Sequence, residues 1–285
     1  MNRMNQETAL TRLFHTVPCR SGRLLARTSF PSVLVESRTV YVWLPPGYGE
    51  VSSRRYPVIY AHDGQNLFTP ETSFAGVDWG VDDAMARLAT QGVAPAMVVG
   101  IWNTPRRYNE YDPEQVFHHC LRPDEQVAYA REHGIPASDN YLRFIAEELK
   151  PFIDATFSSN PGPGSTFMIG SSMGGLISVY ALCLYPELYG GIASLSTHWP
   201  ACGGMMVDYC GRHLPPPGNH KLYFDYGTET DDAPYEPYQL RMDNLLTATG
   251  HTREQEWVTL KFPGEEHSEQ SWRRRVDIPL RFLLS

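Results

Sequence analysis

Short apolar segments rich in β-branched and aromatic residues alternate with segments of helical periodicity along most of the chain. This alternation is typical of the α/β class, in which helices cover both faces of a mostly parallel sheet. Several of the apolar runs are continuous, as expected for strands buried on both faces. The expected strands cover residues 38–45, 57–63, 96–102, 166–171, 191–197, 221–227 and 256–262. The expected helices cover residues 77–91, 139–157, 173–185, 235–250 and 269–284.

The chain has 285 residues, without an internal repeat or a linker-like stretch. We therefore predict a single domain, in which residues 1–37 form an N-terminal extension. Pro151 is expected to kink or split the helix over 139–157, because its ring removes a backbone donor and crowds the preceding turn. Residues 103–137 are polar and contain four prolines. They predict a long irregular connection that forms a lid or wall over the functional site.

The segment FMIGSSMGGLISVY, residues 167–180, places two adjacent serines and three glycines between an apolar run and a helical pattern. Residues 170–174 fit Gly-x-Ser-x-Gly, with Ser172 at the centre. Between a strand and a helix this pattern predicts a nucleophile elbow, a strained turn that lifts the serine hydroxyl above the sheet edge. Side chains on Gly170 or Gly174 are expected to collide with the neighbouring strand or helix. The alternative is a tight turn that needs glycine for its geometry alone.

A serine hydroxyl is a weak nucleophile, so it needs a base, and the base needs a group that orients it. When the nucleophile lies on such an elbow, the acid and then the histidine follow it, each on a loop after a later strand. Among the histidines downstream of Ser172, only His267 lies between a late strand and the last helix. We therefore predict His267 as the base. The alternative is a solvated loop histidine.

The acid is expected on the loop that follows the strand over 221–227. This loop offers three carboxylates, and we favour Asp232, then Glu229, then Asp231. Asp225 lies within the strand itself and is expected to be structural. Some of the loop carboxylates can equally form a solvated acidic turn.

An oxyanion requires two N–H donors. One is expected from the backbone of Met173, directly after the nucleophile. The other is expected from the loop HDGQNLF, residues 62–68, where Gly64 permits a tight turn and the N–H of Gln65 faces the site. The first two residues of this loop are expected to brace it or to cap a turn.

Candidate substrate contacts follow two other strands, at the sheet edge where α/β enzymes bind their ligands. Trp102, Asn103 and Arg106 follow the strand over 96–102, together with Arg107. Trp199 follows the strand over 191–197 and is a candidate wall of an acyl pocket. The alternatives are core packing for Trp102 and solvation for the arginines.

The formal net charge of −8 argues against nucleic acid or an anionic membrane as a partner, since both require concentrated Lys and Arg. No apolar run approaches the ~20 residues of a membrane span, and the first 20 residues lack the apolar core of a secretory signal. Five scattered cysteines favour a reducing, cytoplasmic compartment. Cys202 and Cys210 lack further ligands at metal-binding spacing, so we expect neither a metal nor an organic cofactor.

Four stretches together resemble a known family: YAHDGQNLF, GSSMGGLISVYALCLYPELYGGIASLS, YFDYGTET and GEEH. The family is the esterase family of α/β-hydrolases that includes enterochelin esterases, carbohydrate esterase family 1, esterase D and the antigen 85 mycolyltransferases. The resemblance covers roughly residues 38–284. It implies the α/β-hydrolase fold, Ser172 as nucleophile, His267 as base, an acid after the Tyr-Gly turn, and Gln65 as the second oxyanion donor. Enterochelin esterases usually carry an extra N-terminal domain, and the carbohydrate esterases are mostly secreted, so the resemblance specifies the chemistry better than the substrate.

The leading hypothesis is a serine carboxylesterase that hydrolyses a small-molecule ester through an acyl-enzyme intermediate. Acyl transfer by the same residues is one alternative, and a siderophore or carbohydrate (acetyl or feruloyl) ester as the substrate is another. A non-catalytic binding member of the fold is disfavoured, because all three members of the triad are available. The sequence leaves open the natural substrate, the acyl-chain preference and the oligomeric state, a homo-oligomer included.

Overall fold

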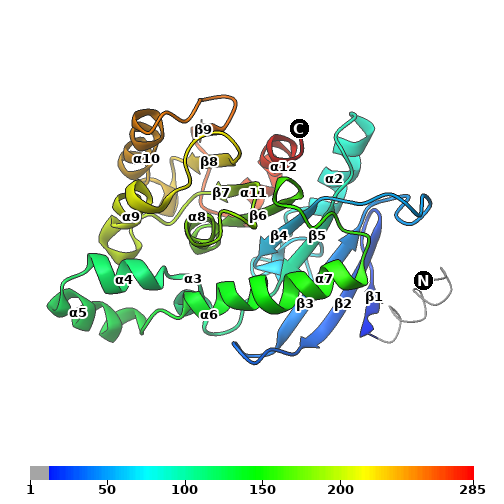
Figure 1. The fold of residues 1–285 in the computed structure, drawn as a ribbon, viewed down its shortest axis with the longest axis horizontal. Helices are drawn as coiled ribbons and strands as arrows, with labels where there is room; N and C mark the ends of the chain where they lie inside the picture. Colours follow the sequence, from blue (N-terminus) through cyan, green and yellow to red (C-terminus); the bar gives the residue numbers. More distant parts are fainter. Residues whose placement is uncertain (1–12) are drawn as a thin grey trace.

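The computed structural model describes residues 13–285, which are built around a nine-stranded sheet (Figure 1). The strand order is β1-β2-β3-β5-β4-β6-β7-β8-β9. The pairs from β1 to β5 are antiparallel, and the pairs from β5 to β9 are parallel, which confirms a mostly parallel α/β sheet. The strands are β1 His15–Val17, β2 Arg23–Phe30, β3 Arg38–Leu44, β4 Val58–His62, β5 Met97–Ile101, β6 Thr166–Ser171, β7 Gly191–Leu195, β8 Lys221–Gly227 and β9 Trp257–Phe262.

The first two strands lie within residues 1–37, which the sequence predicted as an extension. Strand β2 pairs antiparallel with β3, with Leu24 opposite Trp43, and Leu24 is fully buried. This part of the chain therefore belongs to the sheet, and its description as an extension is corrected. Residues 1–12 lie outside the described residues, so the expected absence of a secretory signal stays a prediction.

Helices cover both faces of the sheet (Figure 1). One apolar core lies between the sheet and helices α2, α11 and α12, and a larger core lies on the other face, beneath α6 to α10. None of the helices within residues 13–285 combines the length and apolar character needed to cross a membrane. The helices are α2 Val81–Thr90, α3 Arg107–Tyr111, α4 Glu114–Cys120, α5 Pro123–His133, α6 Ser138–Arg143, α7 Lys150–Thr156, α8 Met173–Leu184, α9 Met206–His213, α10 Glu236–Ala248, α11 Glu269–Arg275 and α12 Asp277–Leu284.

Two of the expected long helices are irregular, and a proline lies near each irregularity. Between α6 and α7 the chain forms a π-helical segment, Phe144–Leu149, directly before Pro151. Pro151 cannot donate the backbone hydrogen bond that a regular α-helix requires, so the expected irregularity takes the form of a π-helical segment and not of a break in the helix. The helix expected over 269–284 is broken after Arg275, and Pro279 lies in the first turn of α12, where its missing donor is tolerated.

The segment 103–137 contains the helices α3, α4 and α5, so the prediction of an irregular connection is wrong. Two of its prolines mark helix starts, since Pro113 precedes α4 and Pro123 is the first residue of α5. Proline is favoured there because the first N–H groups of a helix lack intrahelical partners. Tyr111 and Phe117 are buried in the core, whereas α5 has no buried residue. The segment therefore lies on the domain as a packed helical layer.

Candidate active site

Ser172 lies on the sharp turn between β6 and α8. Its backbone has φ 56° and ψ −124°, a conformation that residues other than glycine rarely adopt. Its N–H donates to the carbonyl of Leu195 at 2.9 Å, and its carbonyl accepts from the N–H of His198 at 3.1 Å. These bonds hold the turn against β7 and the loop after it. A strained serine between a strand and a helix is the backbone geometry of a nucleophile elbow.

The glycines around this turn permit close backbone contact. A Cβ on Gly170 would lie 2.4 Å from the carbonyl oxygen of Gly174, which confirms the predicted collision. A Cβ on Gly174 would meet the Cβ of His62 at 3.2 Å, a tight contact but not an overlap. Gly175 is the second position at which glycine is required, because a Cβ there would lie 2.3 Å from the hydroxyl oxygen of Ser194.

His267 and Asp232 meet at the carboxyl edge of the sheet. His267 Nδ1 lies 2.6 Å from Asp232 Oδ1, and the imidazole side chain is only 12% exposed. The other carboxylate oxygen accepts from the Ser196 hydroxyl at 2.6 Å and from the N–H of Gly227 at 2.5 Å. Burial works to raise the pKa of Asp232, but hydrogen bonds from His267, Ser196 and Gly227 lower it below its ordinary value. The ionised carboxylate can therefore orient the imidazole and stabilise its protonated form.

The other carboxylates of this region lie elsewhere. Glu229 and Asp231 are exposed, and Glu229 accepts a hydrogen bond from Thr228. Asp225 is fully buried and pairs with Arg275 at 2.9 Å, which agrees with the structural role predicted for it. Of the three acids left open by the sequence, the structure brings only Asp232 into contact with His267.

The three triad candidates follow three strands of the parallel part of the sheet, in which the strand order is β6-β7-β8-β9. In the sheet, Ser171 lies opposite Leu195 of β7, and β7 and β9 both flank β8. Ser172, Asp232 and His267 follow β6, β8 and β9, so all three leave the sheet at the same edge. Tyr235 lies beside His267, with 5.9 Å between the centroids of the two rings.

The loop after β4 begins with a second strained residue. Asp63 has φ 54° and ψ 47°, a left-handed conformation, and is 4% exposed. Gly64 is required next, since a Cβ there would lie 2.4 Å from the backbone carbon of Gly100. Gln65 follows, and its carbonyl accepts from the Thr72 hydroxyl at 2.7 Å. The backbone of this loop is thus fixed against β5 and the segment that follows.

The candidate substrate residues after β5 mostly serve internal contacts. Asn103 donates its side-chain amide to Asp63 at 2.7 Å. Arg107 donates to both oxygens of the same carboxylate, whereas Arg106 is exposed. Asn103 therefore braces the loop before Gln65 instead of presenting its amide to a ligand, and Arg107 has the same role.

The two candidate tryptophans are packed against the core. Trp199 is 1% exposed and donates its indole N–H to Gln239 at 3.0 Å, so the acyl-pocket role predicted for it does not fit this conformation. Trp102 is half-buried and packs edge-to-face on Tyr41, with ring centroids 5.3 Å apart. Its indole nitrogen is buried and has no hydrogen-bond partner among the described residues.

Two further residues of this site were missed by sequence reasoning. His198 does not lie between a late strand and the last helix, yet its Nδ1 lies 2.7 Å from the Tyr235 hydroxyl. Tyr235 follows Asp232 by three positions, a proximity that could have drawn attention to it. Neither residue belongs to the pattern that predicts a nucleophile, base or acid.

No group of three or more His, Cys, Asp or Glu side chains within residues 13–285 is arranged to hold a metal ion. The five cysteines are free thiols, and Cys202 donates to Asp112 in the core.

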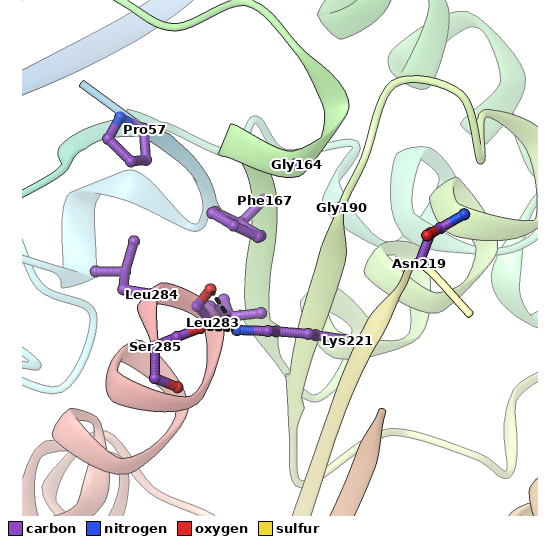
Figure 2. Close-up of a pocket in the computed structure, with 9 residues that line it drawn as sticks. All are labelled: Pro57, Gly164, Phe167, Gly190, Asn219, Lys221, Leu283, Leu284 and Ser285. Carbon is purple, nitrogen blue, oxygen red and sulfur yellow. Dashed lines mark hydrogen bonds between the residues drawn. The ribbon is translucent and has the colours of Figure 1, made fainter. Parts of the chain in front are cut away.

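A cavity of about 180 Å³ lies at the opposite, amino edge of the sheet (Figure 2). It is bordered by Pro57 before β4, Phe167 near the start of β6, and Lys221 at the start of β8. Lys221 donates to the carbonyls of Phe282 and Leu283 and so holds the end of α12. Ligands of α/β enzymes bind at the carboxyl edge, so this cavity is not the site that contains Ser172.

Comparison with known proteins shows the family to which the chain is similar. The family model described as "Putative esterase" matches residues 32–278. The uncharacterized protein YbbA of Bacillus subtilis (strain 168) is 25% identical over 194 residues, which are 68% of this chain and 69% of YbbA.

Two solved structures show the shared fold. A ferulic acid esterase has a TM-score of 0.66 and 17% identity, over 92% of this chain and 97% of its own. The enterobactin esterase FES from Shigella flexneri, in the presence of enterobactin, has a TM-score of 0.64 and 19% identity, over 94% of this chain. The present chain spans 58% of that esterase. The fold is the predicted α/β-hydrolase fold, and the family match supports an esterase activity. Because the family model matches residues 32–278, which is most of the chain, the protein belongs to the Putative esterase family.

Proposed function

We propose that the protein is a serine carboxylesterase that hydrolyses a small-molecule ester through an acyl-enzyme on Ser172. The observation that carries this proposal is the 2.6 Å contact between His267 Nδ1 and the buried carboxylate of Asp232, at the sheet edge where Ser172 is held in a strained turn. A buried, ionised carboxylate beside a histidine is what a base needs in order to activate a serine hydroxyl.

In the first half-reaction, Ser172 Oγ attacks the ester carbonyl carbon while His267 Nε2 takes the hydroxyl proton. The electron pair of the carbonyl bond moves to its oxygen. The backbone N–H groups of Met173 and Gln65 are the proposed donors to this oxyanion. When the intermediate collapses, the bond to the leaving alcohol breaks, and His267 gives its proton to that alcohol.

In the second half-reaction, His267 takes a proton from water, which attacks the acyl carbon. Collapse of the second intermediate releases the carboxylic acid, and the proton on His267 returns to Ser172. Asp232 keeps the imidazole oriented in both halves and stabilises its positive charge. Ser196 and Gly227 hold the second oxygen of Asp232, so the carboxylate itself cannot turn away.

The proposal also covers the cellular compartment, the partners and the class of ester that serves as substrate. The free cysteines favour a reducing cytoplasm. The expected absence of nucleic-acid and membrane partners stays a prediction, as does the oligomeric state. Panels of nitrophenyl acyl esters, acetylated xylan, methyl ferulate and a catecholate siderophore separate simple carboxylesters from carbohydrate and siderophore esters.

The test of the proposed function compares Ser172→Ala with Ser171→Ala on a nitrophenyl acyl ester. Loss of Ser172 is expected to lower kcat by several orders of magnitude in a folded protein, because the covalent route is gone. Ser171 is the matched neighbour, and its substitution is expected to be mild. If folded Ser172→Ala keeps more than about a tenth of the wild-type rate, Ser172 is not the nucleophile.

A further inference from the structure

The hydroxyl of Ser196 holds the second oxygen of Asp232, and two further N–H groups converge on that hydroxyl. Trp272 Nε1 donates to Ser196 Oγ at 3.0 Å, and Arg275 Nη2 donates to it at 3.1 Å. Ser196 is fully buried and directly follows β7. The proposed triad uses neither Trp272 nor Arg275, yet both side chains end on the group that holds the acid.

These contacts fix the direction in which the Ser196 proton points. A serine hydroxyl has one proton to donate and two lone pairs that accept. The side chains of Trp272 and Arg275 carry only N–H donors, so they occupy the two lone pairs. The Ser196 proton is left for Asp232 Oδ2, which lies 2.6 Å from Oγ. A hydrogen bond to a carboxylate is charge-assisted and therefore stronger than one between neutral groups.

The backbone of Ser196 is strained and tied to the nucleophile. Its φ of 45° lies in the range that residues other than glycine rarely adopt. Its N–H donates to the carbonyl of Asp225 at 2.8 Å, and the preceding Leu195 accepts from the N–H of Ser172 at 2.9 Å. Strained residues occur mainly where function requires their geometry, so this conformation favours a role in the site.

Arg275 brings a buried charge into this network without adding net charge. It is 2% exposed, and the same Nη2 that donates to Ser196 also donates to Asp225 at 2.9 Å. Glu265 is the other carboxylate that faces it, 4.0 Å from Nη1. Because the charge of Arg275 is balanced by Asp225, it acts on Asp232 through the orientation of the Ser196 hydroxyl and not through net charge.

Trp272 also contacts the base. Its ring meets the His267 ring edge-on, at 81° with 5.0 Å between the centroids. Helix α11, which carries Trp272 and Arg275, begins two residues after His267. The same helix therefore packs on the base and, through Ser196, holds the acid.

We propose that Ser196 is a positioning residue of the base: with Trp272 and Arg275 behind it, its hydroxyl gives its proton only to Asp232 and so limits how strongly that carboxylate holds the proton on His267. Hydrogen bonds from His267, Ser196 and Gly227 lower the pKa of Asp232 against the effect of burial. A less basic carboxylate stabilises the protonated imidazole less, which keeps the base available near neutral pH. The inference rests on the proposed function, because it takes His267 as the base and Asp232 as the acid.

Three other titratable side chains lie near His267. Tyr235 and His198 stay neutral near pH 7, because burial raises the pKa of the Tyr235 phenol and lowers the pKa of His198 to about 4. Glu269 lies two positions after His267, and burial raises its pKa. All three are the same in the wild type and in the variants below, so a difference in pH dependence between these proteins reports on Ser196.

Ser196→Ala removes the hydroxyl, and Ser194→Ala is the matched control. Ser194 is also fully buried, but its hydroxyl lies 2.6 Å from that of Thr197 and does not contact the acid. The acid limb of the kcat/KM profile reports protonation of the base in the free enzyme. We expect this limb to move to higher pH by about half a pH unit in Ser196→Ala and to stay in place in Ser194→Ala. An unchanged limb in folded Ser196→Ala overturns the proposal.

Ser196→Gly separates the hydroxyl from the strained backbone. Glycine adopts a positive φ readily, so it relieves strain that alanine keeps. Both variants lack the hydroxyl and should show the same shift of the acid limb. A shift in one variant alone would assign the effect to the backbone and contradict the role of the hydroxyl.

Trp272→Phe is the milder variant, and it keeps the proposal testable if loss of the Ser196 hydroxyl prevents folding. It keeps a ring beside His267 and removes one donor to Ser196, so a smaller shift in the same direction is expected. Because Trp272 acts through Ser196, the double variant Ser196→Ala/Trp272→Phe should shift no further than Ser196→Ala. A larger shift in the double variant, or no shift in Trp272→Phe, contradicts this route.

The pH dependence of labelling by a fluorophosphonate probe separates this inference from the proposed function. If Ser172 is labelled and the acid limb of the labelling rate moves to higher pH in Ser196→Ala, both stand. If both proteins are labelled on Ser172 with the same acid limb, the role of Ser196 is wrong and the nucleophile stands. If folded wild-type protein is not labelled at all, the proposed function and this inference both fail.

Discussion

Arg107 donates two hydrogen bonds to the carboxylate of Asp63, one of 2.8 Å from Nε and one of 2.7 Å from Nη2. Asp63 has a left-handed backbone conformation, with φ 54°, and Gly64 and Gln65 follow it directly. A left-handed residue other than glycine costs of order 1 kcal/mol or more. The bonds from Arg107, together with the amide of Asn103, offset this strain and fasten the loop of the proposed oxyanion donor to the start of α3.

Arg107→Gln is therefore expected to release this loop and lower kcat, by about tenfold or more, as a misplaced oxyanion donor does. KM should change less, because the loss falls on the transition state. Arg106→Gln is the matched control, since Arg106 is the exposed neighbour. Steady-state kinetics of both variants check the prediction, and equal effects of the two substitutions would count against it.

The assignment of the acid leads to a second prediction. Asp232→Asn should lower kcat by roughly 10³- to 10⁴-fold, because the amide cannot stabilise the protonated imidazole and favours the wrong tautomer. Glu229→Gln and Asp231→Asn should remain near the wild-type rate, since both side chains are exposed. The three variants are compared on one nitrophenyl ester, and a larger loss at Glu229 would move the acid there.

The sequence predicted the central strands better than the edges. Strands β6 and β8 have the bounds predicted from the sequence, because strands buried on both faces are mostly apolar and stand out from the polar segments around them. Strand β2 was missed because its polar positions Arg27, Thr28 and Ser29 weaken the apolar signal. The short helices α3 to α5 were missed because prolines were interpreted as loop markers, whereas they begin helices.

The order of motifs was sufficient to nominate Ser172 and His267 and to limit the acid to Asp232, Glu229 or Asp231. It could not reveal that Asn103 binds Asp63, that Trp199 is sealed in the core, or that His198 meets Tyr235, because these contacts join loops that are distant in sequence. Such contacts depend on how loops pack at a sheet edge, for which a single sequence carries no periodic signal.

Buried His62 makes the stability depend on pH. Burial lowers its pKa from 6.5 to about 3, so between these values the unfolded chain binds a proton that the folded chain does not. The stability contributed by neutral His62 is thus lost as pH falls below 6.5, at about 1.4 kcal/mol per pH unit.

Between pH 6.5 and 4, the unfolding free energy of His62→Gln should fall less steeply than that of the wild type. The expected difference in slope is about 1.4 kcal/mol per pH unit. Exposed His118→Gln serves as control and should follow the wild type. Urea unfolding monitored by tryptophan fluorescence at several pH values gives the slopes. Parallel slopes for wild type and His62→Gln would contradict a neutral, buried His62.

The helical layer from α3 to α5 is predicted to form the wall of the substrate site. Tyr108 is half-buried, and its hydroxyl lies 3.3 Å from the Tyr129 hydroxyl. Tyr108→Ala should change the ratio of kcat/KM for a bulky and a small ester by about tenfold, or ~1.4 kcal/mol. Val127→Ala, on the exposed side of α5, should leave the ratio unchanged. An unchanged ratio in folded Tyr108→Ala would mean that the helical layer packs on the domain without selecting the substrate.

The central claim is that Ser172 is the nucleophile of a serine esterase, and covalent labelling tests it most directly. A fluorophosphonate probe is incubated with the folded protein, and the modified residue is located by peptide mass spectrometry while ester hydrolysis is followed in parallel. We expect one adduct per chain, on Ser172, with loss of activity in proportion to labelling and no labelling of Ser172→Ala. An adduct on another residue, or full ester hydrolysis by a protein whose Ser172 carries the adduct, would contradict it.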